Sequence, residues 1–176
     1  QNASWRPGNN FGGSSLFKAL GHPITARLGV ELMRRIRQAG PVAVYDPLGE
    51  AADFDVFYGL SACDIAGVYV QQISEIGADI LGHEAKPVTD LPASNAATVL
   101  VCAFDAERFI DHIRALAPPD AVLVSFDDMR LPAAWLSNPR RYLDPINFTT
   151  NFGFLRDSGN LHTIVSSVNY WSGYGA

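Results

Sequence analysis

The sequence predicts an α/β domain: a parallel β-sheet flanked by helices and followed by a C-terminal antiparallel β-hairpin. Short apolar runs such as those at 42–45 and 99–104 lack polar alternation, which is typical of strands covered on both faces. Amphipathic stretches with helical spacing separate these runs, and this alternation favours parallel strands joined by crossover helices. Two β-rich runs near the end of the sequence, joined by residues 157–160, favour a hairpin.

Four segments carry helical spacing or capping signals. They are residues 16–20, 24–39, about 47–60 and 106–117. The second repeats apolar residues at every fourth position, which predicts a buried stripe of Ile24, Leu28, Leu32 and Ile36. By the same spacing the third would bury Leu48, Ala52, Val56 and Leu60. Asp46 before Pro47, and Asp105 before Ala106, are interpreted as the N-caps of the third and fourth helices.

Five β-rich apolar runs predict strands. They are residues 42–45, 65–70, 86–91, 99–104 and 121–126. Right-handed crossovers favour the order 3-2-1-4-5, with the strands numbered along the chain. Farther along, we expect a short helix at 131–138 and the two arms of the hairpin at 148–156 and 161–171.

The composition fits one folded domain and argues against several functions. The chain has 176 residues, of which 48% are hydrophobic and 18% charged, so it can bury a sizeable core. A net charge of −5 argues against binding to nucleic acid or to anionic membranes. No apolar run reaches the roughly eighteen residues that a membrane-spanning helix needs. The N-terminus lacks a secretory pattern, and Cys63 and Cys102 lack metal-ligand spacing, so we expect free thiols and a cytoplasmic protein.

We expect a flexible arm at residues 1–14, rich in Gly, Asn and Ser, and a single domain at 15–176. Within it, 15–130 would form the sheet-containing core, and 131–176 a connector and the hairpin. The aromatic end of the sequence, from Tyr170 onward, has no polar tail. This favours a domain taken from a longer protein, with a neighbouring domain downstream. Assembly into an oligomer stays open.

The order of the predicted elements over residues 30–126 carries a resemblance to known families. The segments VAVYDP, DIAGVYVQQ, ILGHEAKPVTDL and TVLVCAFD follow one another between helices. This succession is similar to the Rossmann-like domain at the C-terminal end of some sugar C-methyltransferases, and to the N-terminal domain of certain sugar-nucleotide acyltransferases. Residues 77–88 resemble the glycine turn that follows the second strand in those families. The resemblance implies a Rossmann-like fold with a ligand beside the first and fourth strands. The chain departs from it at residues 46–49, where such domains usually place glycines.

The predicted ligand site lies at the carboxyl edge of the sheet, between the first and fourth strands, because open α/β sheets bind ligands where the strand order reverses. Residues 46–49 would line one side, and the ends of the fourth and fifth strands the other. The second strand and the glycine turn would close it. The candidate ligand-binding residues are Asp46, Pro47, Leu48, Gly49, Tyr69, Gln71, His83, Phe104, Asp105 and Asp127.

The residue types at this edge argue against several ligands and activities. A dinucleotide fits poorly, because the G-x-G-x-x-G fingerprint is missing, Asp46 would repel phosphate and Pro47 has no N–H to donate. Asp46, Asp105 and Asp127 would share one edge, where carboxylates can hold Mg²⁺. Helix capping accounts for Asp46 and Asp105 without a metal, so we predict no metal site. The sequence also lacks ligand-spaced histidines for zinc and the G-x-S-x-G elbow of hydrolases.

Three hypotheses for function remain. The first is a domain of a larger protein that binds a small ligand of nucleotide or sugar-nucleotide type at the carboxyl edge. The second is a non-catalytic interaction module whose working surface is the hairpin, which is rich in aromatic residues such as Phe152, Phe154 and Trp171. The third is a degenerate S-adenosylmethionine-dependent methyltransferase, because a terminal antiparallel hairpin on a parallel sheet is typical of that architecture. The cofactor, and whether the domain is catalytic, stay open.

Overall fold

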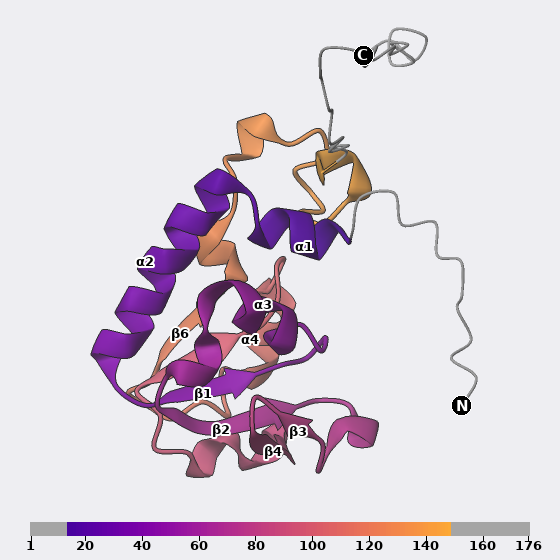
Figure 1. The fold of residues 1–176 in the computed structure, drawn as a ribbon. Coiled ribbons are helices and arrows are strands. Elements are labelled where there is room, and N and C mark those ends of the chain that lie inside the picture. Colours follow the sequence, from indigo (N-terminus) through magenta and orange to yellow (C-terminus); the bar gives the residue numbers. More distant parts are fainter. Residues whose placement is uncertain (1–13, 149–176) are drawn as a thin grey trace, which may run out of the picture.

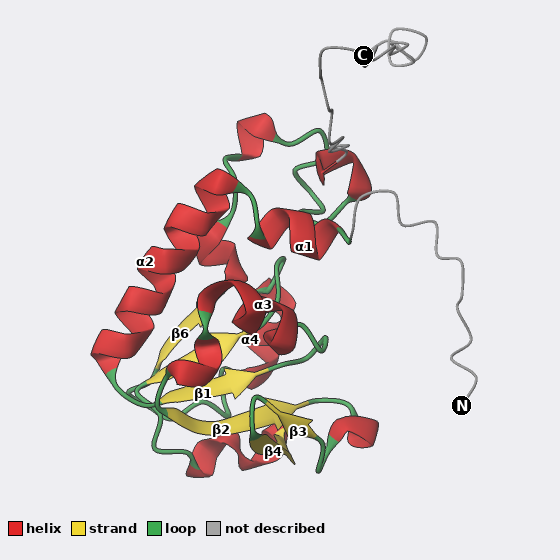
Figure 2. Cartoon of the chain, in the orientation of Figure 1, coloured by secondary structure: helices red, strands yellow, loops and turns green. Residues whose placement is uncertain are grey.

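The computed structural model describes residues 14–148, which form a mixed sheet between two layers of helices (Figure 1 and Figure 2). The strands are β1 Val42–Tyr45, β2 Ile65–Val70, β3 Asp79–Ile80, β4 His83–Pro87, β5 Thr98–Val101 and β6 Val122–Ser125. The α-helices are α1 Ser15–Leu20, α2 Pro23–Ala39, α3 Ala51–Tyr58 and α4 Glu107–Ile113. Short 3-10 helices lie at Leu60–Ala62, Ile73–Glu75, Val88–Ala93, Phe126–Met129, Ala133–Trp135 and Pro145–Phe148.

The sheet has six strands in the order β3-β4-β2-β1-β5-β6, which differs from the five parallel strands that the sequence predicts. β1 pairs in parallel with β2 and β5, β2 with β4, and β5 with β6. At the edge, β3 pairs antiparallel with β4. Leu81 (φ 57°) and Gly82 (φ 79°) form the reversal between them, and two successive positive φ values match the twist of a tight hairpin. The strand expected at 86–91 therefore begins at His83, and Val88–Ala93 is a 3-10 helix.

Each face of the sheet carries its own apolar cluster. Successive residues of a strand point to opposite faces, so β1 gives Val44 to one cluster and Tyr45 to the other. Helices α1, α2 and α3 cover the face that holds Val44. Helix α4 and the 3-10 helix Val88–Ala93 cover the face that holds Tyr45. Coverage on both faces explains why the strands are apolar without alternation.

Helix α2 forms where the sequence predicts it, but its buried face is rotated. Leu32 and Ile36 are buried as expected, whereas Leu28 remains 37% exposed and Gly29 is buried in its place. A Cβ on Gly29 would lie 2.4 Å from the ring of Tyr58, so only glycine lets α3 pack this close. The Tyr58 hydroxyl then donates a hydrogen bond of 2.6 Å to the carbonyl of Leu20.

Helix α3 begins at Ala51, four residues later than Pro47, where the sequence prediction starts it. Leu48 lies in the preceding loop and is 44% exposed, and Val56 is 72% exposed. The predicted stripe is therefore wrong at Leu48 and Val56, while Leu60 is buried in the 3-10 turn after the helix. Phe54 is the large side chain that the helix itself buries. The Phe54 ring stacks on that of Phe126, with 4.6 Å between centroids.

The connector, residues 131–148, folds back over α1 instead of forming the short helix expected at 131–138. It holds 3-10 turns at Ala133–Trp135 and Pro145–Phe148. Lys18 of α1 donates a hydrogen bond from Nζ to the carbonyl of Phe148, at 3.0 Å. The predicted hairpin beyond Phe148 and the N-terminal arm up to residue 13 lie outside the described residues.

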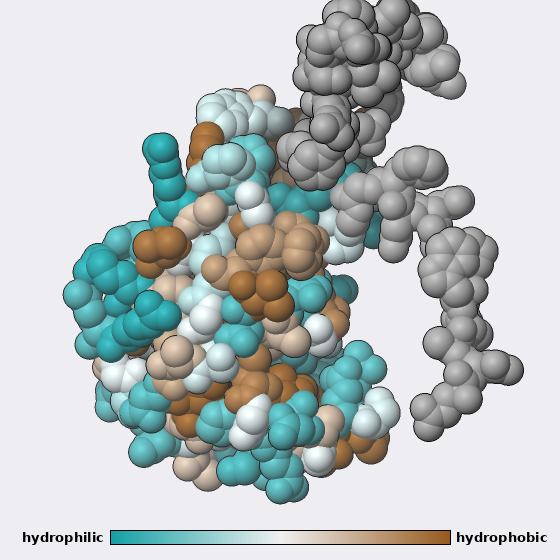
Figure 3. Space-filling view, viewed as in Figure 1, coloured by the Kyte–Doolittle hydropathy of each residue, from teal (hydrophilic) through white to brown (hydrophobic). Residues whose placement is uncertain are grey.

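The visible face of the described residues mixes polar and apolar side chains. Figure 3 shows apolar side chains gathered over α1 and α3, in the middle of the visible face. Within residues 14–148, no helix combines the length and the apolar character needed to cross a membrane.

Candidate functional site

Asp46 directly follows β1 and is only 2% exposed. Its carboxylate accepts backbone N–H groups from Glu50 at 2.8 Å and from Ala51 at 3.2 Å, so it caps α3 across a loop. Burial raises the pKa of Asp46, and the backbone hydrogen bonds oppose that rise. Asp46 therefore binds the first amides of α3, as expected of a cap, but the N-cap residue is Glu50 and not Asp46, because the helix starts later than predicted. The buried carboxylate is engaged by these amides and is not among the residues that line the hollow at this edge.

Glu50 is an unusual acid in the same loop. Burial, then the nearby charges of Asp46 and Asp53, raise the pKa of Glu50 to about 7. Its Oε2 atom is buried and has no hydrogen-bond partner among the described residues. The thiol of Cys102 is fully buried, and burial together with the charges of Asp46 and Glu50 raises its pKa well above the ordinary value. A thiol held neutral in this way is a poor nucleophile, so Cys102 fits a packing role.

The free energy of unfolding is expected to fall between about pH 4.5 and about pH 7 because of Glu50. The folded chain holds the Glu50 proton until about pH 7, while the unfolded chain releases it near 4.5. The folded state therefore binds more protons across this window, and stability is lost as the pH rises. The loss should be about 1–2 kcal/mol, less than the full pKa shift implies, because the side chain is partly exposed.

Urea unfolding of the natural chain and of Glu50→Gln at several pH values measures this slope. Glu50→Gln should flatten it. Glu31→Gln, which alters an exposed acid paired with Arg34, should leave it unchanged. An equal slope in the natural chain and in Glu50→Gln would contradict the assignment.

A hollow of about 390 Å³ lies at the carboxyl ends of β1 and β2, and we call it the carboxyl-edge hollow. Its lining residues are Pro47, Leu48, Gln71, Gln72, Arg108, Phe109 and His112. Three of these, Pro47, Leu48 and Gln71, are candidates from the sequence. The lining contains no carboxylate, and Arg108 and His112 come from successive turns of α4. The hollow thus combines one guanidinium, one imidazole and two glutamine amides with apolar side chains.

Two contacts hold the polar side chains of this hollow in place. The buried Tyr45 hydroxyl donates to Oε1 of Gln71 at 2.8 Å, and burial raises the pKa of Tyr45, which keeps it a donor. The Gln71 carbonyl oxygen is thereby engaged, and its NH₂ group remains to donate. The guanidinium of Arg108 lies 4.5 Å from the ring centroid of Phe109.

Asp105 and Asp127, the candidate carboxylates that follow the fourth and fifth predicted strands, hold the start of α4 and the connector in place. Asp105 does not cap α4, which corrects the prediction: its φ is +51°, and its carboxylate accepts the N–H of Tyr142 at 2.9 Å. Asp127 is the cap, with oxygens 2.9 Å from the N–H of Asp105 and 2.8 Å from that of Ala106. Arg130 bridges Asp105 at 2.7 Å and Asp127 at 3.1 Å. These two carboxylates therefore bind the amides at the start of α4, the guanidinium of Arg130 and the backbone of the connector at Tyr142.

Phe104 is also part of the core and lies away from the carboxyl-edge hollow. It is 4% exposed, and its ring centroid is 4.4 Å from that of Tyr142. Gly49 is exposed with φ +74°, and nothing lies within 4 Å of a Cβ placed there, so it serves the loop conformation.

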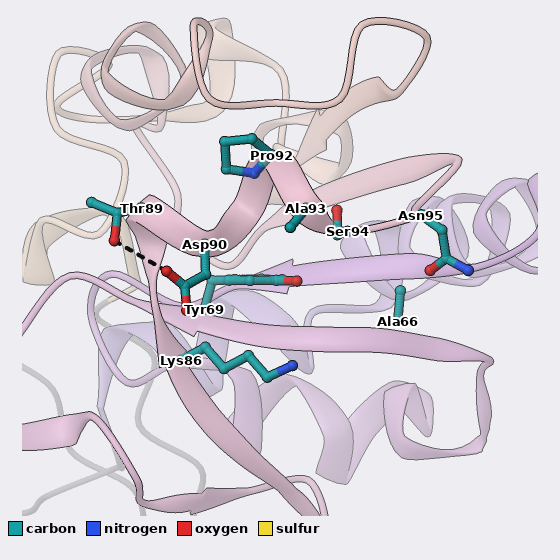
Figure 4. A pocket seen from close by; sticks show the side chains of 9 residues that line it. All are labelled: Ala66, Tyr69, Lys86, Thr89, Asp90, Pro92, Ala93, Ser94 and Asn95. Atoms are coloured by element: carbon teal, nitrogen blue, oxygen red, sulfur yellow. Dashed lines mark hydrogen bonds between the residues drawn. The ribbon is translucent and has the colours of Figure 1, made fainter.

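The structure places Tyr69 in another hollow, of about 410 Å³ (Figure 4). Its ring folds back over Gly67, toward the start of β2, where a Cβ would lie 2.9 Å from the hydroxyl. In Figure 4 it lies between Lys86 and the segment 89–95, with its hydroxyl directed away from Asp90. Burial raises the pKa of Tyr69, which keeps the hydroxyl protonated. Tyr69 therefore does not close the carboxyl edge.

His83 lies at the start of β4, at the opposite end of that strand from the carboxyl edge. It pairs with Ile80 in the β3–β4 hairpin. The prediction placed it in a turn near the ligand because the strand was expected to begin three residues later.

Reasoning from the sequence missed Arg108, His112 and Gln72. A usable signal was present: positions 108 and 112 are one helical turn apart on the helix that follows the fourth strand, so they share a face. Within residues 14–148, no group of three or more His, Cys, Asp or Glu side chains could hold a metal ion. Comparison of the chain with models of protein families, with curated proteins and with solved structures finds no match in any of the three.

Proposed function

We propose that this chain is a small-ligand-binding domain and that its site is the carboxyl-edge hollow. The ligand class is an anionic, phosphate-bearing molecule of nucleotide or sugar-nucleotide type. One observation carries the proposal: Arg108 and His112 meet the ends of β1 and β2 in a hollow with no carboxylate in its lining. The carboxyl ends of parallel strands are where open α/β sheets bind ligands.

The phosphate would be bound by side chains, in contrast to dinucleotide sites. In those sites the free N–H groups at a helix N-terminus receive the phosphate. Here Asp46 already accepts the amides at the start of α3, and Asp127 those at the start of α4. Pro47 also removes one backbone donor from the first loop. The guanidinium of Arg108 is the donor that can hold phosphate with two parallel hydrogen bonds.

The other lining residues suit the rest of such a ligand. The NH₂ groups of Gln71 and Gln72 can donate to hydroxyl or carbonyl oxygens of a sugar or base. Leu48, 44% exposed, and Phe109 supply apolar surface for a ring. A volume of about 390 Å³ is within the range of small-molecule sites.

Arg108→Gln is expected to weaken binding by at least about tenfold, because it removes a charge-assisted pair of hydrogen bonds. Thermal shift and calorimetry would use inorganic phosphate, a nucleoside diphosphate, a nucleoside-diphosphate sugar, coenzyme A and S-adenosylmethionine. Arg114→Gln is the matched control, since the Arg114 guanidinium pairs with Asp111 and lies outside the hollow.

The outcomes separate the hypotheses. Binding of a phosphate-bearing compound that is weakened by Arg108→Gln and not by Arg114→Gln supports the proposal. Selective binding of S-adenosylmethionine favours the methyltransferase alternative and contradicts it. No binding by any compound, or equal effects of the two variants, also contradicts it.

A further inference from the structure

A larger, mostly apolar hollow lies far from the carboxyl edge, between α1, the end of α3 and the connector. Its volume is about 530 Å³. We call it the α1/α3 groove and define it by five apolar side chains: Phe17, Phe57, Leu131, Trp135 and Phe148. Polar residues, among them Lys18 and Asn147, also line it.

Two aromatic side chains of this groove are left open to water. Phe17 is 45% exposed and Trp135 is 61% exposed. Both side chains line the same hollow, and exposed apolar side chains gathered in one place are typical of an interaction site.

The walls of the groove are firmly held, so its shape is preformed. The rings of Phe17 and Phe57 meet edge to face, with 4.6 Å between centroids. The ring centroid of Phe148 lies 5.4 Å from that of the buried Tyr142. The ammonium group of Lys18 donates a hydrogen bond to the carbonyl of Phe148. A preformed apolar groove loses little conformational entropy when it binds a partner.

The segment that follows Phe148 in the sequence is a candidate to occupy the α1/α3 groove. Residue 149 follows directly on Phe148, so segment 149–176 leaves from the wall of the groove. Its large apolar and aromatic residues are Phe152, Phe154, Leu155, Leu161, Ile164, Val165, Val168, Tyr170, Trp171 and Tyr174. Its formally charged side chains are only Arg156 and Asp157. A segment with this composition needs apolar surface to cover its side chains.

We propose that segment 149–176 docks in the α1/α3 groove of its own chain, with side chains of its apolar run 161–171 seated against Phe17 and Trp135. Same-chain docking is favoured because the segment is tethered at Phe148, and the entropy cost of closing a loop grows only slowly with its length. The arm 1–13 is the poorer occupant, since its large apolar residues are only Trp5 and Phe11.

Hydrogen exchange on the full chain, read by mass spectrometry, tests the proposal. Backbone amides in 161–171 are expected to exchange at least about tenfold more slowly than an unstructured chain would. In the double variant Phe17→Ser/Trp135→Ser, this protection should fall about tenfold or more, because the docking surface is lost. Val56→Ser is the matched control: it removes another exposed apolar side chain, on the outer face of α3 and outside the groove.

Two further measurements distinguish loss of docking from loss of the fold and from docking between two chains. Exchange in β1 and β5 must be the same in the natural chain and in both variants, which shows that the core is intact. This is expected because Phe17 and Trp135 are exposed, so their replacement leaves the buried core unchanged. Sedimentation at several concentrations separates same-chain docking from docking in a second copy. Protection that is absent in the natural chain, unaffected by the groove variants, or dependent on protein concentration overturns the proposal. This result is independent of ligand binding at Arg108.

Discussion

Replacing Tyr142 by alanine is expected to lower the free energy of unfolding by about 3–5 kcal/mol, the range for a large buried aromatic side chain. Tyr142 is completely buried. Its ring lies 4.4 Å from that of Phe104 and 5.4 Å from that of Phe148, and the guanidinium of Arg130 lies 4.7 Å from its centroid. The side chain therefore joins the connector to the core, and its removal leaves a cavity at that junction.

Tyr142→Phe separates packing from hydrogen bonding at this junction. The hydroxyl accepts the backbone N–H of Leu131 at 3.0 Å, and the phenyl ring keeps the packing. The variant leaves one buried N–H without a partner, which costs about 1–3 kcal/mol. Its stability should therefore lie between those of the natural chain and Tyr142→Ala.

Urea unfolding, analysed for midpoint and slope, measures both variants. Val56→Ala serves as the surface control and should change stability by less than about 0.5 kcal/mol. A loss of less than about 1 kcal/mol in Tyr142→Ala would show that the connector is not part of the cooperative core, contrary to the 3–5 kcal/mol expected.

Asp127→Ala is expected to destabilise the fold by about 2–3 kcal/mol, combining the loss of a helix cap with two unpaired amides. The Asp127 carboxylate accepts the N–H groups of both Asp105 and Ala106. It also neutralises the half-buried Arg130, which keeps a pair with Asp105 in the variant. Asp127→Asn keeps one acceptor oxygen and should lie between the natural chain and Asp127→Ala.

The adjacent Asp128 provides a closely matched control. Its carboxylate forms a 2.5 Å ion pair with Arg35 at the surface, where such pairs contribute about 0–1 kcal/mol. Thermal and urea unfolding of Asp127→Ala and Asp128→Ala compare the two positions directly. Equal losses at both would overturn the assignment of Asp127 as the cap of α4.

The cap of α4 shows why the site could be predicted only in part from the sequence. Asp105 stands where an N-cap belongs, and by local sequence alone it is as good a cap as Asp46. The difference is tertiary: the backbone at Asp105 is left-handed, and β6 brings Asp127 to the same amides. Two aspartates 22 positions apart are thus both candidates for the cap of α4. A local sequence pattern cannot predict that the distant one, Asp127, binds these amides.

The same limit applies to Tyr69 and His83. Alternation along β2 determines which face Tyr69 occupies, but not that its ring folds back over Gly67 instead of reaching the carboxyl edge. The turn at Leu81–Gly82 lacks the usual Asn-Gly signal of a tight hairpin. Without that signal β3 was not predicted, and His83 was placed in a loop.

Local sequence patterns are sufficient to predict the α/β character, the apolar runs of β1, β2, β5 and β6, helix α2, and a role for the Asp46 carboxylate at the start of α3. Each of these rests on interactions among residues close in the chain: periodic burial, strand propensity and short-range capping. The tertiary structure decided the antiparallel edge, the rotated face of α2 at Gly29, the cap of α4 and the meeting of Arg108 and His112 with Gln71. These features depend on which distant side chains fill the same space, and close packing admits only one of the arrangements that the local patterns allow.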